Sequence, residues 1–477
     1  MLLFILSVSS TFADNIDSQV FEQDSLALVA IYNATNGPDW TNNSGWLNGP
    51  VTDWYGVDLE DNKVSRLLLE SNNLVGTIPE EIGNLTNIEL LKIGINKISG
   101  QIPSSIGNCT KLSYLDVRGN ELTGNIPIEL SNCTELKTIW AINNQFSGSF
   151  PEALLLIPGI EVIRLGGNDF DGQIPASINN LVHLEVLELG ANGFSGTMPS
   201  LNQLIDLVVL YIWGNELEGD MSEILGYHPY LCCLRCFDNK FSGCLSEVHF
   251  NPENLDRLEI YDNEFDCVGD FSSFVDTGVI SRFLCRNNKI PFEFLEKNVG
   301  VETFTYDKQD SLLSPEIHLL AKGGNLQIDS GTRGHSTSYT WYKDNQVIPN
   351  KTDSTLVIQG FSEADEGTYY MKATNSILPD LTLYRHKVHV QADEISGTRY
   401  IAITDLRVYP NPASGQIFFD DLHGEGLVMI FDINGKVVFD EWKSFNAPIP
   451  VDGLPTGLFV LNIQLDGKIY KSKFVKL

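Results

Sequence analysis

The chain has 477 residues, too many for one compact hydrophobic core, so several domains are expected. A formal net charge of −31 argues against nucleic acid as a partner. Most of the acidic excess lies in residues 14–314, where it favours solubility and leaves the binding of divalent cations open.

The N-terminus, residues 1–13, is a short apolar stretch that ends in small residues at Thr11 and Ala13. This pattern predicts a secretory signal peptide that is cleaved after Ala13. No other segment approaches the 18 or so apolar residues that a membrane helix needs, so we expect no transmembrane segment.

Residues 14–62 precede a repeat region and are predicted to cover its open end. The segment from Asp24 to Tyr32 has helical spacing, and Trp40, Trp46 and Trp54 follow in a stretch that we expect to be rich in loops. A stack of repeats needs such a cap because its terminal turn would otherwise expose the core.

A recurring frame, Leu-x-Leu-x-x-Asn-x-Leu-x-Gly-x-Ile-Pro, is first complete from Leu67 to Pro79. Its asparagines are 24 residues apart, except for one step of 23 and one of 25. They are Asn72, Asn96, Asn120, Asn144, Asn168, Asn192, Asn215, Asn239, Asn263 and Asn288. The period predicts about ten stacked repeats over residues 63–312.

Each frame residue has a structural interpretation. The Leu-x-Leu pair predicts a short parallel strand with both leucines inward, and the Asn amide is expected to bond backbone groups where the chain turns. Gly permits a tight bend, and Pro removes a donor that we expect no ladder to use. The fold class is therefore mainly β, a solenoid whose convex side is mostly irregular or 3-10 helical.

All eight cysteines lie in this region, where the frame places Leu or small core residues, so we expect buried free thiols. They are Cys109, Cys133, Cys232, Cys233, Cys236, Cys244, Cys267 and Cys285. The spacing of Cys232, Cys233 and Cys236 is superficially that of a metal or redox cluster. On one predicted strand, however, neighbouring side chains point to opposite faces, and we predict no metal site.

The frame also identifies the side chains that face outward from the concave strands. In repeats seven to ten these form one candidate ligand-binding patch, flanked by Arg257 and Arg282. Its members are Tyr211, Trp213, Arg235, Phe237, Glu259, Tyr261 and Arg286. Aromatic and arginine side chains on a rigid sheet favour recognition of an anionic peptide or polysaccharide. The alternative is that the aromatic rings simply tile the face or cover each other.

Residues 315–392 have the alternating pattern of a β-sandwich. Trp341 is the expected core aromatic, and the run Asp365-x-Gly367-x-Tyr369 resembles a tyrosine corner. This module resembles an immunoglobulin-like domain without a disulfide, because Ile328 and Met371 occupy the two cysteine positions. We expect it to act as a spacer or a secondary adhesion module.

After a polar linker, residues 393–405, the segment 406–477 is predicted to be a second all-β module. Asn434-Gly435 between two alternating runs predicts a hairpin. The order of these motifs, including the basic final strand, resembles the type A C-terminal sorting domain of the Bacteroidetes type IX secretion system. The resemblance implies export by that machinery and a place at the outer-membrane surface or outside the cell.

Residues 24–290 resemble plant-type leucine-rich-repeat ectodomains, including the cap pattern Asn36-Gly37-Pro38-Asp39-Trp40 and Trp54-x-Gly56-Val57. The chain lacks the cysteine pair of the plant cap and any kinase domain, so the resemblance is to a bacterial relative. It implies recognition of proteins, peptides or glycans on the concave face.

Sequence motifs for catalysis are missing: there is no phosphate-binding loop, no His-Glu-x-x-His, no Gly-x-Ser-x-Gly and no kinase signature. We therefore expect no enzyme activity and no cofactor. The favoured function is recognition or adhesion by a secreted or cell-surface protein. The alternatives are a structural envelope component without a discrete ligand, or a noncatalytic glycan-binding subunit.

Overall fold

The computed structural model describes residues 22–272, 274, 280–393, 404–406, 408–419, 422, 425–432, 437–445, 448–465 and 468–477. The predicted signal peptide and most of the predicted linker lie outside the described residues. The chain divides into two compact units. The first extends to Leu312 and includes Gly331–Ser338 and Ala373–Tyr384, and the second comprises Leu313–Ser330, Tyr339–Lys372 and Arg385–Leu477.

The N-terminal cap begins with helix α2 (Glu22–Ala34), as the spacing predicted. The buried Asp24 carboxylate accepts a hydrogen bond of 2.7 Å from the backbone N–H of Val64, which ties the helix to the first turn of the solenoid. Tyr32 packs on Trp40 and Trp46, and Trp46 on Trp54, with ring centroids 4.8–5.7 Å apart. The aromatic side chains therefore form the cover that the sequence predicted.

The stretch expected to be loop-rich contains the 3-10 helices η1 (Gly37–Asp39) and η2 (Val51–Asp53) and a strand, β1 (Val57–Glu60). β1 pairs antiparallel with β2 (Lys63–Leu68). The first turn of the solenoid has no preceding repeat, so β1 supplies partners for its backbone groups.

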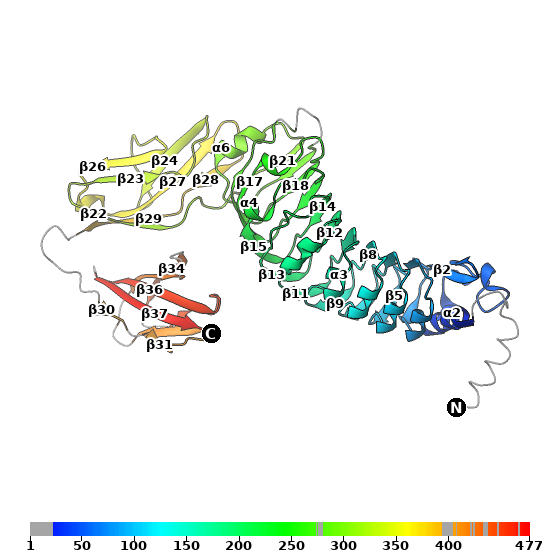
Figure 1. Cartoon of the computed structure of the whole chain (residues 1–477). Coiled ribbons are helices and arrows are strands. Elements are labelled where there is room, and N and C mark those ends of the chain that lie inside the picture. Colours follow the sequence, from blue (N-terminus) through cyan, green and yellow to red (C-terminus); the bar gives the residue numbers. More distant parts are fainter. Residues whose placement is uncertain are drawn as a thin grey trace. The chain divides into compact units, whose positions relative to one another are not determined.

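The Leu-x-Leu segments form one long parallel sheet whose strands follow one another in chain order (Figure 1). After β2 come β4 (Leu90–Lys92), β6 (Tyr114–Asp116), β8 (Thr138–Trp140), β10 (Val162–Arg164), β12 (Val186–Glu188), β14 (Val209–Tyr211), β16 (Cys233–Arg235), β18 (Arg257–Glu259), β20 (Arg282–Leu284) and β21 (Thr303–Thr305). In β4 to β20 the middle residue is buried, for example Leu115 and Ile139, which pair in register. The predicted stacking of inward leucines is confirmed.

A second parallel sheet follows the Leu-x-Gly part of the frame. Its strands are β3 (Val75–Thr77), β5 (Lys97–Gly100), β7 (Glu121–Gly124), β9 (Gln145–Gly148), β11 (Asp169–Gly172), β13 (Gly193–Thr197), β15 (Glu216–Asp220), β17 (Lys240–Leu245) and β19 (Glu264–Val268). The sequence did not predict this sheet, in which neighbouring backbones run side by side and bond each other's polar groups. The frame prolines lie outside its strands, so no ladder uses their missing donor, as expected. Gly100, at φ 78°, makes the expected bend.

Short helices lie between the strands of successive turns, and most of them directly follow a frame proline. They are η3 (Glu80–Asn84), η4 (Ser104–Asn108), η5 (Ile128–Asn132), α3 (Glu152–Leu155), η6 (Ala176–Asn180), α4 (Met221–Ile224), η7 (Glu247–His249), α6 (Phe292–Leu295) and η8 (Glu296–Asn298). Pro79, Pro103 and Pro127 each precede a 3-10 helix in extended conformation. The solenoid thus has the predicted fold class.

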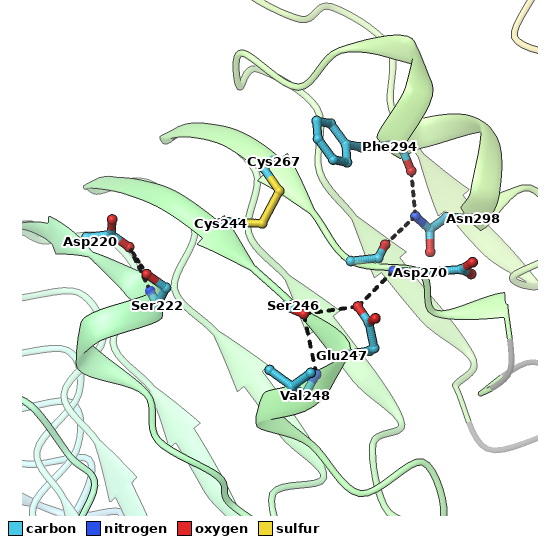
Figure 2. Close-up of a disulfide and its surroundings, with 11 residues drawn as sticks. Asp220, Ser222, Cys244, Ser246, Glu247, Val248, Cys267, Asp270, Phe294 and Asn298 are labelled. Atoms are coloured by element: carbon cyan, nitrogen blue, oxygen red, sulfur yellow. Dashed lines mark hydrogen bonds between the residues drawn. A yellow bond between two sulfur atoms is a disulfide. The ribbon is translucent and has the colours of Figure 1, made fainter. Parts of the chain in front are cut away.

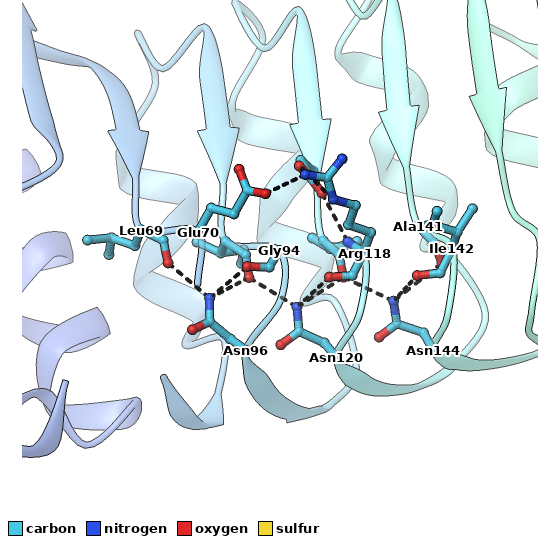
Figure 3. Close-up of polar contacts among 12 residues, drawn as sticks. Leu69, Glu70, Gly94, Asn96, Arg118, Asn120, Ala141, Ile142 and Asn144 are labelled. Carbon is cyan, nitrogen blue, oxygen red and sulfur yellow. Dashed lines mark hydrogen bonds and ion pairs between the residues drawn. The ribbon is translucent and has the colours of Figure 1, made fainter. Parts of the chain in front are cut away.

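The frame asparagines join neighbouring turns, as Figure 3 shows for Asn96, Asn120 and Asn144. Asn120 Oδ1 accepts from the N–H of Ile98 at 2.9 Å, and its Nδ2 donates to the carbonyls of Ile93 and Val117 at 3.0 Å each. Each amide therefore bonds its own turn and the preceding one, which confirms the role predicted for it.

Gln309 extends this ladder by one further turn. Its Oε1 accepts from Ile290 N–H at 3.0 Å, and its Nε2 donates to the carbonyls of Cys285 and Tyr306. The sequence frame missed this turn, which contains β21, because Gln replaces Asn.

Cys244 and Cys267 form a disulfide between β17 and β19 (Figure 2), so the expectation of free thiols is wrong for this pair. The parallel register places the two residues opposite each other with Cα atoms 4.5 Å apart, within the range that a disulfide spans. Cys109 and Cys133 are buried free thiols, as predicted, and burial raises the pKa of Cys133 to about 11.

Residues 316–393 form two sheets. The larger contains β22 (Glu316–Ala321), β24 (Thr337–Lys343), β25 (Gln346–Val347), β27 (Gly367–Asn375), β28 (Thr382–Tyr384) and β29 (Val388–Asp393), and the smaller β23 (Asn325–Asp329) and β26 (Thr355–Gln359); η9 (Glu363–Asp365) precedes β27. Trp341 is buried and donates from Nε1 to Asp353 O at 2.9 Å. The buried Tyr369 donates its hydroxyl to the Asp365 carbonyl, as expected of a tyrosine corner.

The C-terminal module forms two further sheets around a core that includes Val428, Ile463 and Phe474. One sheet contains β30 (Thr404–Asp405), β33 (Glu425–Phe431), β34 (Val437–Ser444), β36 (Gly457–Leu465) and β37 (Lys468–Lys476), and the other β31 (Val408–Tyr409), β32 (Gln416–Phe419) and β35 (Ile449–Pro450). β33 and β34 pair antiparallel, as the predicted hairpin requires. The Asn434-Gly435 turn lies outside the described residues.

Candidate recognition surface

Four candidate residues form a continuous row across the C-terminal half of the concave face. Trp213, Phe237, Tyr261 and Arg286 each lie two residues after a concave strand, from β14 to β20. The rings of Trp213 and Phe237 stack at 5.3 Å and those of Phe237 and Tyr261 at 4.3 Å, with interplanar angles of 12° and 9°. The Arg286 guanidinium lies 5.0 Å from the centre of the Tyr261 ring. We call this row the aromatic ladder.

The stacking determines which parts of the rings can meet a ligand. Phe237 has one neighbour stacked on each face, so it offers its ring edge. Tyr261 is likewise covered by Phe237 on one face and by Arg286 on the other. At the other end, a Cβ atom on Gly190 would lie 2.5 Å from Trp213 Nε1, so the ring needs glycine beneath it. The ladder therefore presents mainly ring edges and one guanidinium group.

The other three candidates, Tyr211, Arg235 and Glu259, lie on the strands beside the ladder. The Arg235 guanidinium is 4.7 Å from the Tyr211 ring centre. Glu259 is only 5% exposed, and its carboxylate meets Arg235 Nε at 3.4 Å and Arg282 Nε at 3.0 Å. Glu259 thus positions two arginines, and the seven sequence-predicted residues lie together.

Ion pairs offset part of the positive charge on this surface. Arg257 forms an ion pair with Asp256 at 3.1 Å, and Glu259 offsets part of the charge of Arg235 and Arg282. Arg286 is exposed at the end of the ladder. Burial, helped by the Glu259 charge, raises the pKa of Tyr261, so its hydroxyl remains a donor at neutral pH.

A second concave cluster, which was not among the residues predicted from the sequence, surrounds Trp140. The guanidinium groups of Arg118 and Arg164 lie 4.5 Å and 5.4 Å from its ring centre. Arg118 also forms an ion pair with Glu70 (Figure 3), and Arg164 pairs with Glu188 at 2.8 Å. The same outward columns of the frame contain these residues, but their pairing across repeats becomes visible only in the structure.

The described ranges show neither a membrane-spanning helix nor a cluster of metal-binding side chains. No helix within them has the length and apolar character needed to cross a membrane. The same residues contain no group of three or more His, Cys, Asp or Glu side chains arranged to hold a metal ion.

Two family models match parts of the chain. The model of the secretion system C-terminal sorting domain matches residues 407–477, and the leucine-rich-repeat model matches residues 63–85 and 111–133. No curated protein matches the sequence. The chain thus carries leucine-rich repeats and a type IX sorting domain, which implies the type IX secretion machinery as a partner. The protein is secreted or located on the outer-membrane surface.

Several solved structures are similar to the solenoid. PEPR1–AtPEP1 is 25% identical, with 62% of this chain and 46% of that chain covered and a TM-score of 0.51. The plant peptide hormone receptor RGFR1 in complex with RGF2 is 27% identical over 53% of this chain and 40% of that chain, with a TM-score of 0.45. The BIR3–SERK2 complex from Arabidopsis thaliana is 30% identical over 36% and 95%, with a TM-score of 0.33. The chain spans less than half of the first two proteins.

Proposed function

We propose that the solenoid is a noncatalytic recognition module that binds an extended, carboxylate-bearing peptide segment of a protein partner along the aromatic ladder. The observation that carries the proposal is the continuous row from Trp213 to Arg286. Short parallel strands fix the spacing of this row, so little side-chain freedom is lost on binding.

The chemistry of the ladder favours a peptide over a sugar. The edges of aromatic rings carry partial positive charge and attract carbonyl and carboxylate oxygens. A sugar would stack on a ring face, whereas neighbouring side chains cover both faces of Phe237 and of Tyr261. The exposed Arg286 adds a full positive charge at one end of the row.

The remaining modules fit the same role. We interpret residues 315–392 as an immunoglobulin-like spacer, supported by the buried Trp341 and the Tyr369 corner. We assign the chain to a Bacteroidetes bacterium on the sorting domain at residues 407–477. In this arrangement the sorting domain directs export and the solenoid meets the partner outside the outer membrane.

The proposal is tested by screening the full mature chain against peptide and glycan arrays. We expect binding to acidic peptides that weakens at least about tenfold in the Trp213→Ala/Tyr261→Ala/Arg286→Ala variant. Tyr227→Ala/Tyr230→Ala, which removes two exposed aromatic residues outside the ladder, should bind as wild type does. Acidic-peptide binding that survives in the triple variant, or selective binding of glycans, would refute the proposal. An absence of any hit would support a structural envelope role.

A further inference from the structure

Cys232 and Cys233, at the start of β16, have their Sγ atoms 2.8 Å apart. The alternation of side chains along a strand predicted opposite faces for the two cysteines, which is wrong because β16 begins at Cys233. Cys232 lies before the strand, so side-chain alternation does not apply to it. Its N–H bonds Val208 O, and its carbonyl accepts from Asp256 N–H at 2.9 Å, which fixes the backbone here.

The separation of the two sulfurs is unusually short for non-bonded atoms. Heavy atoms of this kind rest at roughly 3.5–4.0 Å, whereas a disulfide bond is about 2.0 Å long. Both side chains are also partly exposed, in contrast to the buried lone thiols Cys109 and Cys133. The pair is therefore close to bonding distance and open to small reagents.

The electrostatic environment makes one of the two thiols reactive near neutral pH. When Cys232 ionises, the Cys233 thiol donates a hydrogen bond to the thiolate, which lowers the pKa of Cys232 to about 7. The same interaction raises the pKa of Cys233. Because a thiolate is the nucleophile in disulfide exchange, Cys232 is the attacking group.

We propose that Cys232 and Cys233 are a redox-active vicinal dithiol that a low-molecular-weight disulfide converts reversibly into a disulfide. The Cys232 thiolate attacks one sulfur of the reagent, whose S–S bond breaks and releases one thiolate. Cys233 then loses its proton and attacks the Cys232 sulfur, which expels the second thiolate. The two cysteines lose two electrons and two protons, and the reagent becomes two thiols.

The backbone geometry of the two cysteines and the cellular location of the protein both support a reversible disulfide. Adjacent Cα atoms are about 3.8 Å apart, less than the roughly 4.4–6.8 Å of ordinary disulfides. The bridge would therefore be strained and easier to reduce than Cys244–Cys267, whose Cα atoms are 4.5 Å apart. An exported protein also meets an oxidising environment. Cys233 pairs with Val209, two residues before Tyr211 on β14, which places the dithiol near the candidate recognition surface.

The test treats the folded, full-length mature protein with oxidised glutathione, blocks remaining thiols by alkylation, and measures the peptide that contains both cysteines by mass spectrometry. We expect this peptide to lose two hydrogens and escape alkylation, and mild dithiothreitol to reverse the change while Cys244–Cys267 stays intact. Cys232→Ser and Cys233→Ser should instead retain glutathione on the remaining thiol. Cys236→Ser, which removes a buried neighbour, should behave as wild type.

A second measurement needs no oxidant. Phenylarsine oxide condenses with two neighbouring thiols, forming two As–S bonds and releasing water. The reduced wild type should bind it stoichiometrically, and either single serine variant should lose that binding while circular dichroism shows an unchanged fold. The proposal is overturned if the wild type keeps both thiols alkylatable after oxidation, if it accumulates a stable glutathione adduct, or if it fails to bind phenylarsine oxide.

Discussion

The frame asparagines hold neighbouring turns together through bonds that few other side chains could make. One amide supplies both an acceptor and two donors, and Asn120 uses them for Ile98, Ile93 and Val117. Aspartate would lose the donors. Leucine would leave the Ile98 N–H without its partner, while the carbonyls of Ile93 and Val117 would keep the amides of Asn96 and Asn144. The sequence predicted this role because the residue type and its period appear together.

Replacement of a frame asparagine should therefore be costly. We expect Asn120→Ala to lower the unfolding free energy by about 2 kcal/mol, because Asn120 is 8% exposed and its loss leaves the buried Ile98 N–H without a partner and removes two further hydrogen bonds. Urea unfolding followed by circular dichroism measures the change. Asn202→Ala, at an exposed position, should have the same urea unfolding midpoint as the wild type within experimental error. Equal midpoints for both variants would contradict this account.

His228 is a fully buried histidine whose two ring nitrogens face the carbonyls of Gly226 and Leu201 at 3.1 and 3.2 Å. Burial lowers its pKa below the ordinary 6.5. As the pH falls through about 6.5, the unfolded chain takes up a proton before the folded chain does. Stability is thus complete above that pH and declines below it.

We expect the unfolding free energy of the wild type to decrease between about pH 7.5 and 5, by at most about 1.4 kcal/mol per pH unit for one proton. The unfolding free energy of His228→Gln should decrease less steeply. Part of the decrease should remain, because burial also lowers the pKa of His249. Chemical unfolding at several pH values gives the two slopes. Identical slopes in the two proteins would show that His228 does not cause the pH dependence of stability.

At the scale of single elements, the sequence predicted those that the frame specifies directly: the inward strands, the bend at Gly100 and helix α2. It missed the second sheet, since the strands of that sheet contain glycine and polar residues without a clear alternation. It also missed the disulfide, because only the register of β17 against β19 brings Cys244 beside Cys267.

This disulfide should stabilise the turns that it joins. We expect Cys244→Ser/Cys267→Ser to lose about 2–4 kcal/mol of unfolding free energy, in keeping with a sequence separation of 23 residues. Urea denaturation without reductant measures the loss. The wild type unfolded in strong reductant should reproduce the variant, and a variant as stable as the oxidised wild type would contradict the prediction.

At the scale of the whole molecule, the sorting domain and the solenoid have separate roles. Deletion of residues 406–477 should leave the protein inside the outer membrane, because the sorting domain is what the type IX machinery recognises. Cell fractionation and surface proteolysis measure its location. A chain that lacks residues 315–392 but keeps the sorting domain should still be exported. Surface exposure of the first variant would refute this assignment.

The sequence predicted which residues form the candidate site but not how their side chains are arranged. The frame places Trp213, Phe237 and Tyr261 in one outward column, so their proximity follows from the period. Their edge-on presentation depends on side-chain rotamers and on Gly190 beneath Trp213, and the burial of Glu259 between two arginines depends on pairing across strands. Neither is encoded in a repeat pattern.

The central claim, that the ladder is the recognition surface, is tested most directly by Gly190→Ala. The added Cβ would lie 2.5 Å from Trp213 Nε1 and displace the ring without removing any side chain of the ladder. Gly159→Ala, whose Cβ would meet Lys137 Nζ at 3.5 Å, is the matched control. Calorimetric titration of an acidic peptide from the array should show at least about tenfold weaker binding for Gly190→Ala and unchanged binding for the control. Wild-type affinity in a folded Gly190→Ala protein would contradict the account.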